Sequence, residues 1–231
     1  MKIQCKRGVV LSAIASACLI LGALPSQASS PWSGGLNIWF AEWEINRPDG
    51  DINVGREPIL MPYVAYTAGK VEYMVTAGLG DGYEYERRGM NREGERVDLR
   101  GVASFAVTDA VSAGVALHSI KTELSRIDSA VEVSRIGPEA IISYVRAIGS
   151  TGLSGAVSGY VGYYRWDAEG WFDDDGELFG YGLDAGLSYG SGRLTIRAGL
   201  RIEHFEDDVG NASRLPEAEF TGAYIGGGVA L

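Results

Sequence analysis

The sequence predicts an all-β chain that folds as a transmembrane antiparallel up-and-down β-barrel of about ten strands, with eight strands as the alternative. Three observations predict it. Apolar residues alternate with small or polar residues at period two in many runs. The connections between runs are short, then long, then short again. Glycine is abundant at 33 residues, beside 12 tyrosines. A membrane sheet has this composition because lipid contacts one face of each strand and a narrow lumen contacts the other.

The first 28 residues have the features of a cleavable Sec signal peptide, which leaves the barrel to residues 29–231. Lys6 and Arg7 precede an apolar stretch over 9–24, and small residues up to Ala28 suit a signal peptidase. An uncleaved anchor is the alternative, but the stretch is short for one and a good cleavage site follows it. No later segment has about 18 consecutive apolar residues, so no transmembrane helix is expected.

The net charge and the cysteine content argue against two classes of function. Both cysteines, Cys5 and Cys18, lie in the predicted signal, so the mature chain would use no disulfide or thiol chemistry. The net charge of −10 falls to about −13 once the three cations of the signal are removed. Such an acidic chain is not expected to bind nucleic acid. The remaining length predicts one domain.

Alternation predicts ten strands, in order at about 35–46, 57–67, 70–85, 96–107, 111–124, 139–148, 153–166, 178–189, 192–205 and 219–231. The third is the clearest, because apolar side chains occupy one of its faces over ten residues. These are Val71, Tyr73, Val75, Ala77 and Leu79. The sixth is the weakest, because both of its faces are partly apolar. Pro62 predicts a bulge in the second strand, since proline cannot donate to the ladder.

The connections predict the orientation of the barrel. Tight turns are expected at 68–69, 108–110, 149–152 and 190–191, and longer polar loops at 47–56, 86–95, 125–137, 167–177 and 206–218. Outer-membrane barrels have short periplasmic turns and long external loops, so both termini would lie in the periplasm. A soluble sandwich or lipocalin-like barrel is the alternative, but it would face water with charged residues where this chain has glycine, serine and alanine.

With these features the chain resembles the small outer-membrane β-barrel proteins of Gram-negative bacteria, at the level of architecture and of no specific family. The last strand places Ala223, Ile225 and Val229 on one face with Leu231, as the assembly signal of those barrels does. That signal usually ends in an aromatic residue, and here the last residue is leucine. The resemblance implies location in the cell outer membrane. It also implies contact with membrane lipid and lipopolysaccharide, and recognition by the barrel-assembly machinery.

Inward-facing charges form the best-defined candidate site. They are Glu72, Asp98, Arg100, His118, Asp184, Arg197, Arg201 and Glu203. A three-residue turn after Val107 would place Arg100 opposite His118, and a turn at Gly190-Ser191 would place Asp184 opposite Arg197. Because a lone buried charge is costly, the favoured interpretation is a structural salt-bridge network. The alternative is a charged constriction that selects small solutes.

The loops offer weaker candidates. Arg87, Arg88 and Arg92 could hold lipopolysaccharide phosphates at the rim. The acidic loops read as solvated surface rather than as a metal site, and no cofactor is expected. Enzyme chemistry is not expected either, because His118 and Ser119 would face opposite sides of a strand and His204 lacks a facing pair of aspartates.

The sequence therefore predicts a non-enzymatic barrel that is structural or a narrow passive channel for small solutes. Two alternatives remain open, a surface binding protein or adhesin acting through its loops and a lipid-modifying or proteolytic enzyme. The oligomeric state stays open.

Overall fold

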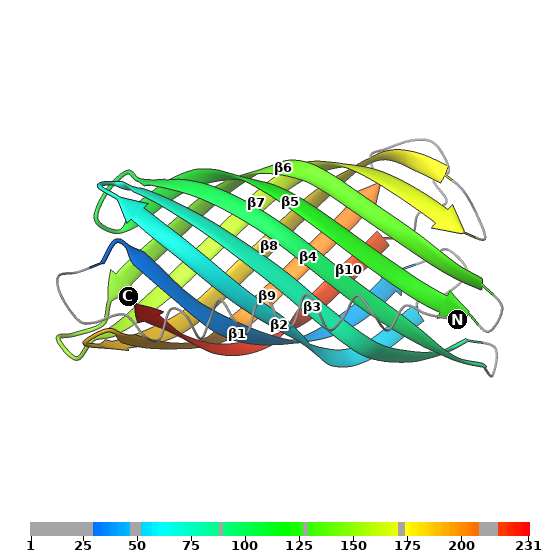
Figure 1. Ribbon diagram of the computed structural model, residues 1–231, viewed down its shortest axis with the longest axis horizontal. Coiled ribbons are helices and arrows are strands. Elements are labelled where there is room, and N and C mark those ends of the chain that lie inside the picture. The colour runs from blue at the N-terminus through cyan, green and yellow to red at the C-terminus, as the bar shows by residue number, and fades with distance from the viewer. Residues whose placement is uncertain (1–29, 47–51, 88–89, 127–128, 171–173, 208–216) are drawn as a thin grey trace.

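The computed structural model describes residues 30–46, 52–87, 90–126, 129–170, 174–207 and 217–231. These residues form ten strands: β1 (Trp32–Asn46), β2 (Ile52–Ala68), β3 (Val71–Arg87), β4 (Met90–Ala106), β5 (Val111–Arg126), β6 (Ser129–Ala147), β7 (Leu153–Gly170), β8 (Asp174–Ser191), β9 (Leu194–Asp207) and β10 (Glu217–Ala230). Neighbours in the chain pair antiparallel, and β1 also pairs with β10, so the sheet closes (Figure 1). The predicted ten-stranded barrel is confirmed, and the eight-stranded alternative is wrong because β2 and β6 are full strands. No helix in the described ranges is long and apolar enough to cross a bilayer.

The two ends of the barrel differ. At the turn end, tight turns join β2 to β3, β4 to β5, β6 to β7 and β8 to β9. The C-terminus also lies at this end, at the left of Figure 1, where the backbone N–H of Leu231 donates to the carbonyl of Trp32 at 2.9 Å. At the opposite end, here called the loop end, residues 47–51, 88–89, 127–128, 171–173 and 208–216 connect the strands.

The polarity of the strand faces reverses between the two ends. In β1, the outward Phe40 is 42% exposed, whereas the inward Trp43 is 2% exposed and the outward residue beside it is Glu44. In β7, the outward Val161 and Tyr163 give way to Arg165 and Asp167 toward the loop end. The wall near the turn end is thus apolar outside, as lipid requires. Near the loop end it is apolar inside and charged outside, as in a water-soluble barrel.

This reversal overturns most of the predicted long loops. Residues 52–56, 90–95, 129–137, 167–170 and 174–177 lie in strands rather than in loops. Where the structure describes their side chains, the outward ones are largely polar, so these segments resemble loop sequence when the apolar face is assumed to point outward. The strands therefore continue past the apolar belt, and the barrel wall is longer than the sequence pattern predicts.

The bulge predicted at Pro62 is also wrong, because Pro62 pairs in register with Leu36. The register shifts occur nearer the loop end, between β1 and β2 and between β3 and β4. Gly55 and Gly82 lie at these shifts with φ of 92° and 88°, a backbone conformation that glycine adopts at little cost. Pro62 does interrupt pairing with β3, as a residue without an N–H must.

The hairpin of β8 and β9 turns two residues later than predicted. Its turn is Gly192-Arg193, with Gly192 at a φ of 61°, rather than Gly190-Ser191. The pairing register therefore places Asp184 opposite Arg201, and the predicted pairing of Asp184 with Arg197 is wrong. The glycine that adopts a positive φ marks the position of this turn better than the dipeptide Gly190-Ser191 does.

Candidate functional site: the lumen

The loop-end half of the lumen is filled by large apolar side chains. They form one continuous cluster inside the barrel. Trp43 stacks on Phe220 with ring centroids 5.2 Å apart and meets Tyr83 edge-on at 5.5 Å. Tyr164 packs edge-on against Phe205 at 5.6 Å. All five of these side chains are 2% exposed or less, so the rings leave no open path along this part of the lumen.

Arg96 holds two carboxylates at the inner edge of this apolar cluster. Its Nε donates to Asp98 at 3.0 Å, and its Nη2 donates to Glu203, across the barrel on β9, at 2.5 Å. The Arg96 guanidinium also lies 3.9 Å from the ring centroid of Phe220. Its side chain is 0% exposed. Because the group is desolvated, its charge depends on these partners rather than on water.

Glu139 is the centre of a second buried cluster. It accepts hydrogen bonds from Arg100 Nε at 2.7 Å and from the hydroxyl of Tyr164 at 2.5 Å. Its Oε1 also lies 2.7 Å from His118 Nδ1. These residues come from β4, β5, β6 and β7, so one carboxylate joins four adjacent strands. Such a cross-strand network stabilises a single arrangement of side chains in the lumen.

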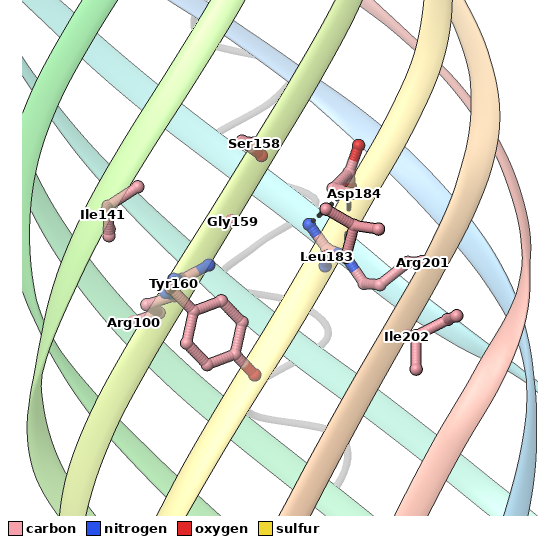
Figure 2. A pocket seen from close by; sticks show the side chains of 9 residues that line it. All are labelled: Arg100, Ile141, Ser158, Gly159, Tyr160, Leu183, Asp184, Arg201 and Ile202. Carbon is pink, nitrogen blue, oxygen red and sulfur yellow. Dashed lines mark hydrogen bonds and ion pairs between the residues drawn. The ribbon is translucent and has the colours of Figure 1, made fainter.

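The third cluster lies nearer the turn end and is partly exposed. Arg201 Nε donates to Asp184 Oδ2 at 3.1 Å, and the Tyr224 hydroxyl donates to Asp184 Oδ1 at 2.9 Å. A cavity of about 30 Å³ borders this pair and Arg100, large enough for water and little more. Figure 2 shows Arg201 reaching toward Asp184, with Tyr160 beside Arg100.

The inward residues of the turn-end half of the lumen are more exposed than those of the loop-end half. We call the turn-end half the vestibule. Beside the larger Tyr63, Arg197 and Tyr224, it has inward residues that are small and partly exposed, in contrast to the buried rings of the other half: Ser104, Gly114, Ser143, Ala156, Ser158 and Ser188. The lumen is therefore tightly packed toward the loop end and less tightly packed toward the turn end.

The structure brings most of the predicted charges into the lumen, but not as one network. Asp98 and Glu203 join through Arg96, Arg100 and His118 join through Glu139, and Asp184 pairs with Arg201. Arg100 is opposite His118, as the predicted turn requires. Two residues stand apart: Glu72 is exposed near the mouth of the vestibule, and Arg197 lies over the ring of Tyr63.

The predicted site lacks Arg96, Glu139, Tyr164 and Tyr224 of these clusters, and also Arg135, which donates to Thr122 near them. Arg96 faces inward in the predicted fourth strand but was not assigned to the site. The sequence pattern predicts Glu139 only as the first residue of a weak strand, and it places Arg135 in a loop. Alternation within β6 (Ser129–Ala147) is the signal that finds both, since Arg135 and Glu139 share its inward face.

The lipopolysaccharide candidates are not placed. Arg88 lies outside the described residues, as do the side chains of Arg87 and Arg92. No group of three or more metal-ligating side chains comes together among the residues that the structure describes.

The two histidines lie on opposite faces of the wall. His118 is in the lumen, and Ser119 is on the outer face, so they form no dyad. His204 is outward near the loop end, where its ring lies 5.0 Å from that of Tyr181. Its ring nitrogens are 3.6 and 3.7 Å from Glu219 and Glu206. In the part of the chain that the structure describes, the polar and ring contacts of both histidines are with carboxylates and tyrosines.

Comparison with known proteins rests on structure alone, because no protein-family profile and no curated protein sequence matches. The translocator domain of autotransporter NalP from Neisseria meningitidis is similar over 99% of this chain and 99% of that chain, with a TM-score of 0.52 and 12% identity. The outer membrane protease OmpT from Escherichia coli is similar over 90% of this chain and 99% of that chain, with a TM-score of 0.53 and 7% identity. The chain has the fold of an outer-membrane β-barrel. The predicted resemblance is confirmed at that level, and identities this low carry nothing about activity.

Proposed function

We propose that this chain is a closed, non-enzymatic barrel of the Gram-negative outer membrane with a structural role. The observation that carries the proposal is the packed aromatic interior of the loop-end half. A conduit needs a continuous polar path, whereas here Trp43, Tyr83 and Phe220 are at most 2% exposed inside the wall. The sequence predicts a structural barrel or a narrow passive channel, and these buried rings favour the structural role over the channel.

The outer surface supports the location. Large apolar side chains remain exposed on the turn-end part of the wall, among them Val115, Leu117, Leu194, Ile196 and Leu200. A contiguous apolar belt of this kind is stable in lipid and not in water. The turn end would face the periplasm, and the charged loop-end wall would project outside the cell. Export would remove residues 1–28, and the barrel-assembly machinery would read β10.

The expected result in a planar bilayer is silence. The refolded protein should give no steady openings, because the aromatic cluster excludes water from half of the lumen. Heat-modifiable migration in a gel shows that the barrel has folded. Single-channel recording of the folded protein, with a general porin in the same lipid as the positive control, measures the result.

A plug-removal variant tests the cause of the silence. Replacing Trp39, Trp43 and Phe220 together with glycine should produce openings if the folded variant still inserts. Steady openings from the unaltered protein would overturn the proposal and favour the channel. The Arg197→Ala variant, altered only in the vestibule, should stay silent.

A further inference from the structure

Among the residues that the structure describes, one partly exposed arginine of the lumen has no carboxylate partner. Arg96, Arg100 and Arg201 each form an ion pair with a carboxylate. Arg135 donates to Thr122 and forms no ion pair within the described ranges, but its side chain is buried at 4% exposure and is out of reach of a solute. Arg197 differs in being partly exposed: among the described residues no carboxylate pairs with it, and its Nε has no hydrogen-bond partner.

We propose that the vestibule binds one small oxyanion, a carboxylate or a phosphate, on Arg197. A guanidinium presents a planar fork of donors that matches two oxygens of either group. The neighbouring carboxylate does not compete for this fork, because Asp184 is already engaged by Arg201 and Tyr224. An anion entering from the turn end would thus meet an arginine with free donors.

The wall holds this arginine in place before any ligand arrives. The guanidinium carbon of Arg197 lies 4.5 Å from the ring centroid of Tyr63. Tyr63 can lie there because glycines occupy the wall beneath it: a Cβ at Gly228 would come within 2.1 Å of the Tyr63 hydroxyl, and one at Gly35 within 2.7 Å of its ring. The glycines therefore make room for an aromatic platform, and the platform positions the cation. A positioned side chain loses little freedom when it binds.

Hydroxyl groups lie beside the arginine on the next strands. Ser188 on β8 is directly opposite Arg197, and Ser154 on β7 is directly opposite Ser188. Their Oγ atoms are 3.5 Å apart. Side chains directly opposite on antiparallel strands have Cβ atoms about 5 Å apart, so an oxyanion on Arg197 is within reach of the Ser188 hydroxyl. The row therefore combines one fixed cation with neutral donors, a combination that suits a monoanion.

Water reaches this row. Arg197, Ser188 and Ser154 are all partly exposed although they face inward. Their exposure is the same whether or not the loop-end half is closed, so this inference does not depend on the proposed function.

Isothermal titration calorimetry on the refolded protein in detergent micelles tests the site, at fixed ionic strength in chloride. Phosphate and acetate are titrated separately, so that the two arms show which oxyanion is taken. The expected result is saturable binding of at least one of them with one site per chain. Arg197→Gln should weaken that binding by about tenfold or more, since a charge-assisted bidentate contact is lost. Ser188→Ala should weaken it less.

The matched control is Arg193→Gln, which removes the same charge from the exposed turn of the same hairpin and should bind like the unaltered protein. Each variant is first shown to be folded by heat-modifiable migration. Absence of saturable binding for both anions would overturn the proposal. Equal loss in Arg193→Gln and Arg197→Gln would also overturn it, because the effect would then be one of net charge.

Discussion

Replacing Arg96 with methionine is expected to lower the free energy of unfolding by about 3–5 kcal/mol, because two buried carboxylates lose their shared partner. Asp98 and Glu203 are at most 5% exposed and both contact the Arg96 guanidinium. Methionine keeps much of the volume but none of the charge, so the carboxylates must be protonated or hydrated within a closed interior. Urea unfolding in lipid vesicles, followed by tryptophan fluorescence, measures the change.

The matched control is Arg56→Met. Arg56 pairs with Glu42 at 2.7 Å, a similar distance, but its side chain is 65% exposed on the outside of the wall. Water and salt screen such a pair, so the expected loss is only about 0–1 kcal/mol. Combining Arg96→Met with Asp98→Asn and Glu203→Gln should recover part of the stability. Equal losses in the two single variants would contradict the assigned role of Arg96.

The turn-end half of the fold was predictable from alternation, and the loop-end half was not. Val71, Tyr73 and Val75 face lipid, and a single apolar face identifies their strand at once. In β6, the inward Val131 and Val133 are buried while Glu132 points outward, so the same alternation continues with its apolar side turned inward. If the apolar face is assumed to point outward along the whole strand, such a segment looks like a polar loop. The reversal marks the level at which the barrel wall leaves lipid. Its cause is the change of solvent around the wall rather than strand propensity.

The sequence predicts which residues belong to the candidate site better than it predicts which of these residues pair with one another. Alternation finds an inward arginine such as Arg201, but its partner depends on the register of the hairpin, and a turn placed two residues early moves each partner by four. Clusters that join strands distant in the sequence are harder still to predict. The contact of Arg96 with Glu203 crosses the lumen between β4 and β9, and only the closed geometry of the barrel brings these residues together.

Replacing Trp43 with alanine is expected to lower the free energy of unfolding by about 3–5 kcal/mol, because it opens a cavity in a packed interior that cannot collapse around a closed sheet. Trp43 contacts both Phe220 and Tyr83, and a Cβ at Gly94 would approach its ring within 3.0 Å. The backbone of Trp43 pairs in register with Phe220 of β10, and its neighbours Glu42 and Glu44 pair with β2 on the other side, so relaxation is limited. The same unfolding measurement in vesicles applies.

Phe40→Ala is the comparison that separates the interior from the lipid face. Phe40 lies three residues earlier on β1 and points outward, where lipid chains can fill the space that its ring leaves. The loss should therefore be clearly smaller than for Trp43→Ala. If the two losses were equal, the loop-end interior would not be a packed core, and the argument that it closes the lumen would fail with it. A larger loss for Trp43→Ala, found together with a silent bilayer, would tie the stability of this barrel and its closure to the same aromatic cluster.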